Sequence, residues 1–320
     1  MKKVVSIIFV LVTIFLVFGL IFIKINLSAF SLDSKNQVFV INAGDSIKTI
    51  SQNLEEKDLI KNHFVFIAYS FLTRQNKKIQ SGTYRLSPSL STPELLEKLT
   101  TGGISDYWLK IPDGSRLEET ANLFPKDLTF TSQDFLTQTK NKEGYLFPDS
   151  YLIPQYFSLD QTLKVIYDHF NQKFTQAKKD STSTLSDQKI LVLASLLERE
   201  GKSLESKQMI AGIILNRLSI NMALQLDATV QYARDSQNKN IKEYWQPITK
   251  SSLSINSVYN TYKNTGLPPK PICSPGYNSL YAAFHPTDSN YIYYITGDDG
   301  LMHYAITLAE HNSNIAKYLK

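Results

Sequence analysis

The chain contains very little cysteine. Its 320 residues include only Cys273, so an internal disulfide is excluded and the fold must be stabilised by packing alone. The five histidines are scattered, and neither a His-Glu-x-x-His motif nor a pair of cysteines occurs. We therefore expect neither a metal site nor another cofactor.

A strong excess of charge of one sign is also absent. The chain has 34 basic and 29 acidic residues, a net charge of +5, and no clustered basic stripe. Nothing in this balance predicts a nucleic-acid partner. Apolar residues make up 42% and charged residues 20%, which is typical of a folded protein, and the length favours about two domains.

Only one stretch is apolar enough to span a membrane. Val4 to Ile23 contains no charged residue, and twenty helical residues match the roughly 30 Å hydrocarbon core. Because Lys2 and Lys3 precede it, the positive-inside rule predicts a cytoplasmic N-terminus and a chain that continues on the outer (periplasmic or extracellular) face. We predict residues 1–25 as the cytoplasmic tip and transmembrane helix of a single-pass protein of the cytoplasmic membrane. A cleaved signal peptide is the alternative, but Leu27-Ser28-Ala29 matches a cleavage site poorly.

Residues 26–37 are expected to form a tether, and residues 38–105 a small α/β module. Val38 to Ile41 is a β-branched strand candidate, and Gly44-Asp45-Ser46 supplies turn and N-cap chemistry before a helix. There follow a helix at His63 to Leu72, a strand at Gly82 to Leu86 and a helix start at Ser91 to Glu94. This order of strand, Gly-Asp-Ser turn and helix resembles a LysM-like module, a family that binds glycans of N-acetylated amino sugars.

Residues 106–320 are expected to form a larger mixed α+β domain. We expect helices at Leu163 to Phe174 and Met209 to Leu218, a helix capped by Asp227, and a hairpin around Gly297 to Gly300. The aromatic segment Glu143 to Tyr151 is punctuated by Gly and Pro, and it is either a packed hinge or a cleft wall whose rings stack on a ligand. The predicted fold class is therefore α+β, with a transmembrane helix, a small α/β module and a larger α+β domain.

One apolar helix ends in an unusual cluster of charge. Ile190 to Gly201 is apolar on almost every face and closes on Glu198, Arg199 and Glu200. Glu198 shares a helix side with apolar residues, and burial would raise its pKa and suit it to be a general acid. The alternative is an ordinary surface ion pair between Glu198 and Lys202, worth about 0.3–0.5 kcal/mol.

Eight short motifs occur in one order along most of the chain. They are Glu143-Gly144-Tyr145-Leu146-Phe147-Pro148-Asp149, Ala194-Ser195-Leu196-Leu197-Glu198-Arg199-Glu200, Asn216-Arg217-Leu218, Leu224-Gln225-Leu226-Asp227-Ala228-Thr229-Val230, Tyr259-Asn260-Thr261-Tyr262, Gly266-Leu267-Pro268-Pro269, Pro275-Gly276 and Glu310-His311-Asn312. In this order they resemble the YceG-like family of endolytic murein transglycosylases. The resemblance implies a membrane-anchored enzyme that cleaves nascent peptidoglycan strands between N-acetylmuramic acid and N-acetylglucosamine, which would terminate strand elongation.

The resemblance places the catalytic acid at Glu198. It implies that one carboxyl group first protonates the glycosidic oxygen and then accepts the proton of the sugar's own C6 hydroxyl, which leaves 1,6-anhydro-N-acetylmuramic acid ends without using water. We expect substrate contacts at Gln225, Asn260, Tyr262 and His303, although His303 could equally pack within the hairpin. The partners implied are peptidoglycan glycan strands, the cytoplasmic membrane and cell-wall synthases.

Two other classes of function remain open at this point. A hydrolase of the same glycan would need a second carboxylate, for which Glu200, Asp227 and Glu310 are the candidates. Capping or ion pairing explains each of these three residues equally well. A glycan-binding scaffold without catalytic activity is the other alternative.

Overall fold

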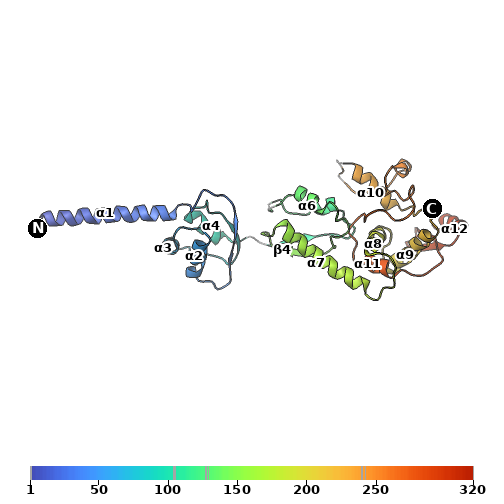
Figure 1. Cartoon of the computed structure of the whole chain (residues 1–320), viewed down its shortest axis with the longest axis horizontal. Helices are drawn as coiled ribbons and strands as arrows, with labels where there is room; N and C mark the ends of the chain where they lie inside the picture. The colour runs from blue at the N-terminus through green and yellow to red at the C-terminus, as the bar shows by residue number, and fades with distance from the viewer. Residues whose placement is uncertain are drawn as a thin grey trace. The chain divides into compact units, whose positions relative to one another are not determined.

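The computed structural model describes residues 2–103, 106–126, 128, 130–238, 241 and 243–319, with side chains described from Ile8 onward. The chain divides into two compact units, here called the N-terminal unit (residues 1–107 and 153–157) and the C-terminal unit (residues 108–152 and 158–320). Figure 1 shows the elements of both in sequence colours. The N-terminal unit extends to Tyr107 before the chain enters the C-terminal unit. The domain boundary predicted between residues 105 and 106 remains a prediction.

The N-terminal unit begins with one long apolar helix. Helix α1 spans Lys2–Leu27, and the apolar residues Ile8–Leu27 within it are long enough to cross a membrane and are not buried by the protein. A signal sequence near an N-terminus has the same length and composition. The helix predicted at Val4 to Ile23 is therefore present, and its composition fits a membrane anchor or a signal sequence.

The rest of this unit is a two-stranded sheet covered by helices. The elements in order are β1 (Gln37–Ile41), α2 (Ile47–Glu56), α3 (His63–Leu72), β2 (Gly82–Leu86) and α4 (Thr92–Thr101). Strands β1 and β2 pair antiparallel with Phe39 opposite Tyr84, and both side chains enter the core. Ser46 caps α2 by accepting a hydrogen bond from Thr49 N–H, as the Gly-Asp-Ser turn predicts. Helices α2, α3 and α4 lie together at the end of α1 (Figure 1).

The C-terminal unit is mainly helical, with two small sheets. Its elements are β3 (Tyr107–Lys110), α5 (Leu117–Ala121), α6 (Ser132–Thr139), β4 (Ser150–Ile153), α7 (Leu159–Lys178), α8 (Asp187–Glu200), α9 (Leu204–Ser219), α10 (Asp227–Gln237), the 3-10 helix η1 (Lys250–Ser254), α11 (Tyr277–Phe284), β5 (Tyr293–Thr296), β6 (Met302–Ala305) and α12 (Leu308–Tyr318). Strand β3 pairs with β4, and β5 pairs with β6. The mixed α+β class predicted from the sequence is confirmed.

Helix α8 lies at the centre of the core of this unit. Residues 190–197 are buried one after another, as expected for a helix that is apolar on almost every face. Helix α11 packs against α8, α9 and α7. The sequence analysis assigned no helix at Tyr277–Phe284, because Pro275 and Gly276 directly before it are typical of a loop. Gly276 is instead the N-cap of α11.

One capping prediction is wrong, and the predicted hairpin is confirmed. Helix α10 begins at Asp227, its N-cap is Leu226, and no side chain caps it. The Asp227 carboxylate accepts a hydrogen bond from the Tyr262 hydroxyl at 2.6 Å instead of bonding the helix terminus. Strands β5 and β6 form the antiparallel hairpin around Gly297 to Gly300.

A group of buried charges joins α5 to α10. Arg116 is fully buried, donates to Glu118 and to the Ser236 hydroxyl, and lies 4.3 Å from the ring centroid of Tyr232. Glu143 is buried beside them, and the Tyr232 hydroxyl contacts its carboxyl group at 3.5 Å. Burial, and then the charge of Glu118, raise the pKa of Glu143 to about 8.

We expect the raised pKa of Glu143 to make the protein less stable as the pH rises from about 4.5 to about 8. The folded state keeps this proton until about pH 8, whereas the unfolded chain loses it near its ordinary pKa of 4.5. The free energy of unfolding should therefore fall by up to about 1.4 kcal/mol for each pH unit between these values. Glu143→Gln should remove this loss, so denaturation curves of the variant should change less from pH 5 to pH 8 than those of the unmodified chain. The exposed variant Glu205→Gln is the control, and equal pH dependence in all three proteins would contradict the prediction.

Candidate active site

Two glutamates near the end of α8 point to different sides of the helix. Glu198 and Glu200 are two positions apart, which separates their side chains by about 200° around the axis at 3.6 residues per turn. Each lines a different cavity of the C-terminal unit. We call these the Glu198 cavity and the Glu200 cavity, and they are separate candidates for the catalytic site.

The Glu198 cavity has a volume of about 580 Å³. It is lined by Asp113, Phe147, Pro148, Asp149, Lys173, Glu198, Gly201, Lys202, Lys207, Gly276, Tyr277 and Asn278. The aromatic segment Glu143 to Tyr151 thus supplies part of a cavity wall, which agrees with the cleft-wall alternative.

Three donors surround the carboxylate of Glu198. Lys207 Nζ lies 3.0 Å from Oε1, Gly276 N–H donates to Oε2 at 2.8 Å, and the Ser279 hydroxyl donates to Oε2 at 2.7 Å. The side chains of Glu198 and Lys207 are only 10% and 7% exposed. The ion-pair partner is therefore Lys207 rather than Lys202, and the charged carboxylate is well satisfied and holds the start of α11 against α8.

The turn at Pro112 to Ser115 lies beside Glu198. Gly114 N–H donates to the Ser274 carbonyl at 2.9 Å, and Gly114 has a φ of +74° that favours glycine. This places Asp113 in the Glu198 cavity, where partial burial and then the charge of Glu198 raise its pKa. The spacing of Asp113 from Glu198 in the sequence gave no sign of this contact.

The Glu200 cavity has a volume of about 460 Å³ and contains many of the motif residues. It is lined by Glu200, Arg217, Gln225, Asp227, Tyr262, Tyr293, Tyr294, Ile295, Leu308 and His311. The Tyr294 hydroxyl donates to Glu200 Oε2 at 2.9 Å. Desolvation raises the pKa of Glu200, and the nearby charge of Asp227 acts in the same direction. Glu200 is therefore a second candidate for the general acid beside Glu198, whose side chain is only 10% exposed.

Two motifs build one wall of the Glu200 cavity from distant parts of the chain. Leu226 N–H donates to the Thr261 hydroxyl at 2.9 Å, and Gln225 N–H donates to the Thr261 carbonyl at 3.2 Å. The hydroxyls of Thr229 and Thr261 lie 2.9 Å apart. These buried bonds fix the loop before α10 against the loop at Tyr259 to Tyr262, which brings Gln225 and Tyr262 into the same cavity.

A third motif attaches the hairpin to α9. Arg217 donates to the Ile292 carbonyl at 2.6 Å and lies 5.6 Å from the ring centroid of Tyr293. Asn216 donates to the carbonyls of Ser289 and Tyr291. The pair Asn216-Arg217 thus positions the tyrosines of β5 over Glu200.

The structure brings together two of the four predicted substrate contacts. Gln225 and Tyr262 line the Glu200 cavity. Asn260 is fully buried, and its side chain donates to the carbonyls of Leu253 and Ile255, so it shapes the loop. His303 stacks on Tyr318 with ring centroids 3.5 Å apart, as its packing alternative predicts.

The motif Glu310-His311-Asn312 contributes a residue that was not among the predicted substrate contacts. Glu310 accepts from the N–H groups of Ile306 and Thr307 and belongs to the capping box of α12. His311 stacks on Tyr293 and lines the Glu200 cavity. Its Nδ1 is buried and has no hydrogen-bond partner among the described residues, so it could bond a ligand there. Within the described ranges, this cavity included, no three His, Cys, Asp or Glu residues are grouped in a way that could hold a metal ion.

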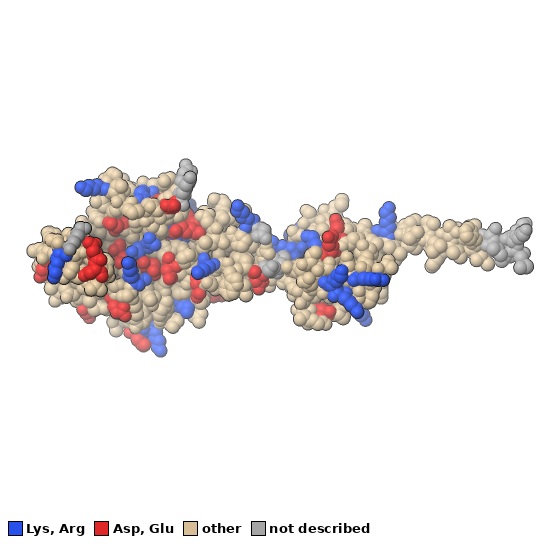
Figure 2. Space-filling view, turned by 180° about the vertical axis from the view of Figure 1, so that it is seen from behind, with Lys and Arg blue, Asp and Glu red and all other residues tan. Residues whose placement is uncertain are grey.

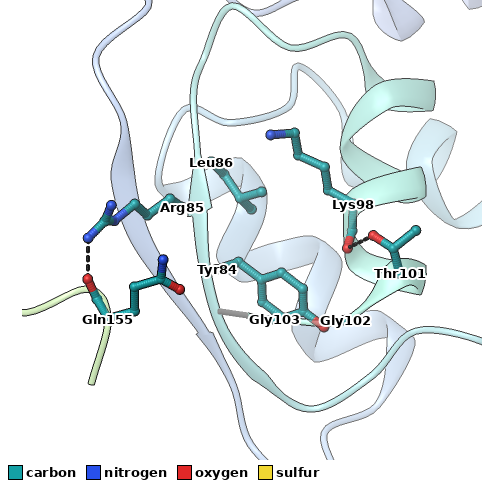
Figure 3. A pocket seen from close by; sticks show the side chains of 8 residues that line it. All are labelled: Tyr84, Arg85, Leu86, Lys98, Thr101, Gly102, Gly103 and Gln155. Carbon is teal, nitrogen blue, oxygen red and sulfur yellow. Dashed lines mark hydrogen bonds between the residues drawn. The ribbon is translucent and has the colours of Figure 1, made fainter. Parts of the chain in front are cut away.

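The N-terminal unit has a smaller cavity of its own. It has a volume of about 300 Å³ and is lined by Tyr84, Arg85, Leu86, Lys98, Thr101, Gly102, Gly103 and Gln155. In Figure 3 the Arg85 guanidinium donates to the carbonyl of Gln155, and the side chain of Lys98 extends from α4. This cavity contains no carboxylate that could act as an acid.

Known proteins are similar to this chain over most of its length. An endolytic murein transglycosylase of Bacillus subtilis strain 168 is 29% identical and aligns with 90% of this chain and 86% of its own. One from Streptococcus pneumoniae serotype 2 is 27% identical over 94% of this chain, which spans only 62% of that relative. A crystal structure of a yceG-like protein from Listeria monocytogenes is 29% identical, covers 87% of this chain and 98% of its own, and has a TM-score of 0.53.

A family model matches nearly the whole chain beyond the N-terminal helix. The matched residues are 39–317, and the model describes the YceG-like family. All of the motifs that form the Glu198 and Glu200 cavities lie within this range. The chain therefore belongs to the YceG-like family.

Proposed function

We propose that this protein is an endolytic murein transglycosylase that cleaves peptidoglycan through Glu200. The observation that carries the proposal is the Glu200 cavity, where a desolvated carboxyl group lies among amide, phenol and imidazole side chains from three other motifs, those of Gln225, Tyr262 and His311. Such polar side chains suit the hydroxyl and acetamido groups of a glycan. The names of the relatives from Bacillus subtilis and Streptococcus pneumoniae support the same activity.

The proposed reaction needs a single carboxyl group. Protonated Glu200 gives its proton to the glycosidic oxygen, and the bond from that oxygen to C1 of N-acetylmuramic acid breaks. The C6 hydroxyl oxygen of the same sugar bonds to C1, and the Glu200 carboxylate accepts its proton. The products are a strand with a 1,6-anhydro end and a strand with a free hydroxyl. A raised pKa of Glu200 suits the first step, because the acid must hold a proton when substrate binds.

We prefer Glu200 to Glu198, which the sequence analysis placed in this role. The two oxygens of Glu198 already bond Lys207, the N–H of Gly276 and the hydroxyl of Ser279, so three protein donors occupy the positions that a substrate would need. Glu200 accepts one hydrogen bond, from Tyr294, and its pKa is raised. Asp227 bonds Tyr262 and is suited to orient that phenol.

The location of the protein is part of the same proposal. Helix α1 anchors the chain in the cytoplasmic membrane, with the N-terminus inside and both units outside, where nascent glycan strands are made. Cleavage there would terminate strand elongation beside the cell-wall synthases. The N-terminal unit acts as a LysM-like module, a role supported by its strand, helix, helix, strand order and its antiparallel sheet.

Digestion of purified peptidoglycan by the full-length protein tests the activity. We expect fragments with 1,6-anhydro ends, which mass analysis separates from reducing ends because they are lighter by one water. Internal cleavage should give long fragments early in the reaction. Reducing ends would indicate a hydrolase with a second carboxylate, and intact strands would indicate a glycan-binding scaffold; either result overturns the proposal.

A further inference from the structure

The apolar face of α3 is left uncovered by the protein. Phe64 is 69% exposed, Phe71 55% and Leu72 84%. Ala68 lies four positions after Phe64, three before Phe71 and four before Leu72, a spacing that puts these side chains on one side of the helix. The opposite side is anchored in the core by Phe66 and Ser70. The exposed apolar face therefore belongs to a helix whose opposite side is packed in the core.

The position of α3 in its unit suggests what covers this face. Helix α3 packs against α1, the helix that is apolar enough to cross a membrane. Lys61, two residues before α3, donates to the Ile25 carbonyl at 3.3 Å and to the Ser28 hydroxyl at 2.8 Å, at the very end of α1. The exposed face thus begins next to the point where α1 would leave the hydrocarbon core.

The segment that contains α3 is basic, and the nearest acidic side chain, Glu55 of α2, is bonded to His63 at the start of the helix. From Leu59 to Pro93 the sequence has no acidic residue, and its basic residues are Lys61, Arg74, Lys77, Lys78 and Arg85. Arg74, Lys77 and Lys78 follow directly after Leu72 and are exposed. Figure 2 shows several blue Lys and Arg side chains on the N-terminal unit near the base of α1. Basic side chains beside an apolar helix face are typical of helices that lie in a membrane interface.

We propose that α3 is a second membrane contact, lying in the interface with Phe64, Phe71 and Leu72 inserted among the lipids. The contact holds the N-terminal unit against the bilayer instead of leaving it free to rotate about the end of α1. It rests on the proposed membrane anchoring by α1 and does not depend on the catalytic activity. The preferred partner is a bilayer with anionic headgroups.

Site-specific labelling can test this contact in the full-length chain. Cys273 is the only cysteine and is fully buried, so a thiol label on the folded protein reports an introduced position. Leu72→Cys and Phe64→Cys place a fluorophore on the exposed face. Lys48→Cys on α2, also exposed, is the matched control. The labelled proteins are reconstituted in vesicles of phosphatidylethanolamine and phosphatidylglycerol that contain lipids with a quencher near the headgroup.

We expect lipid quenching at positions 64 and 72 to exceed that at position 48 several-fold. Equal, weak quenching at all three positions would overturn the proposal. Shielding of positions 64 and 72 from both the lipid quencher and aqueous acrylamide would also overturn it, because a protein partner would then cover the face. Carbonate extraction of the same vesicles distinguishes the α1 anchor from the α3 contact. A protein that stays in the vesicles with unquenched labels is anchored by α1 but lacks the α3 contact. A protein that is released lacks the α1 anchor.

Discussion

Glu200→Gln should reduce the rate of peptidoglycan cleavage by about 10²- to 10⁴-fold, the range lost with a general acid and base. The amide keeps the shape of the carboxyl group, and its oxygen can still accept the hydrogen bond from Tyr294. It cannot carry a proton to the glycosidic oxygen, so binding of glycan should persist while turnover is lost. Release of anhydro ends, followed by mass analysis at matched protein concentrations, measures the effect.

Glu198→Gln is the matched control, because it makes the same change two positions away on the same helix. It should leave the rate within a few-fold of the original while lowering stability, since Lys207 would lose its carboxylate partner inside the protein. Breaking a buried pair typically costs about 3–5 kcal/mol. Thermal unfolding of both variants separates the two effects. The reverse pattern, with an inactive Glu198→Gln and an active Glu200→Gln, would return the acid to Glu198.

Arg116→Ala should destabilise the C-terminal unit by about 3–5 kcal/mol, the range for truncation of a large, fully buried side chain to alanine. Arg116 is fully buried and is surrounded by the rings of Tyr232, Tyr244 and Trp245. The substitution removes these contacts and leaves Glu118 without its partner. Denaturant unfolding followed by tryptophan fluorescence measures the loss, because Trp245 lies in the cluster.

A control for this prediction uses another basic residue. Lys164 pairs with Asp168 on the surface, and Lys164→Ala removes an ion pair of a kind worth about 0.3–0.5 kcal/mol. If Arg116→Ala cost no more than Lys164→Ala, the buried cluster would not contribute to stability and the assignment would be wrong.

Regular elements with strong periodicity could be predicted from the sequence. The apolar N-terminal helix, the helix of residues 190–200 and the Gly297–Gly300 hairpin are present because each follows from local spacing or turn chemistry. Helix α11 was missed, since the signals before it are those of a loop. Asp227 was assigned to a cap because no local pattern shows that the phenol of Tyr262, 35 residues later, binds it.

The choice between Glu198 and Glu200 shows where sequence reasoning ends. The two residues share one helix end, and periodicity placed the apolar neighbours on the side of Glu198. What distinguishes them comes from distant segments: Lys207 and Ser279 bond Glu198, whereas Tyr294 bonds Glu200 and Asp227 lies near it. Only the folded structure shows which partners each carboxyl group has.

The buried bonds of Thr261 have a consequence for how the Glu200 cavity forms. Thr261 bonds the N–H of Gln225 through its carbonyl, and the N–H of Leu226 and the hydroxyl of Thr229 through its side chain. One residue thus closes a contact between segments more than thirty residues apart. Closing such a long loop costs more conformational entropy of the chain than forming a local helix does. We expect this wall to be among the last parts of the C-terminal unit to fold and among the first to open. The amide hydrogen of Leu226 should then exchange with solvent faster than those in the middle of α8, and activity should be lost on heating before the helices melt.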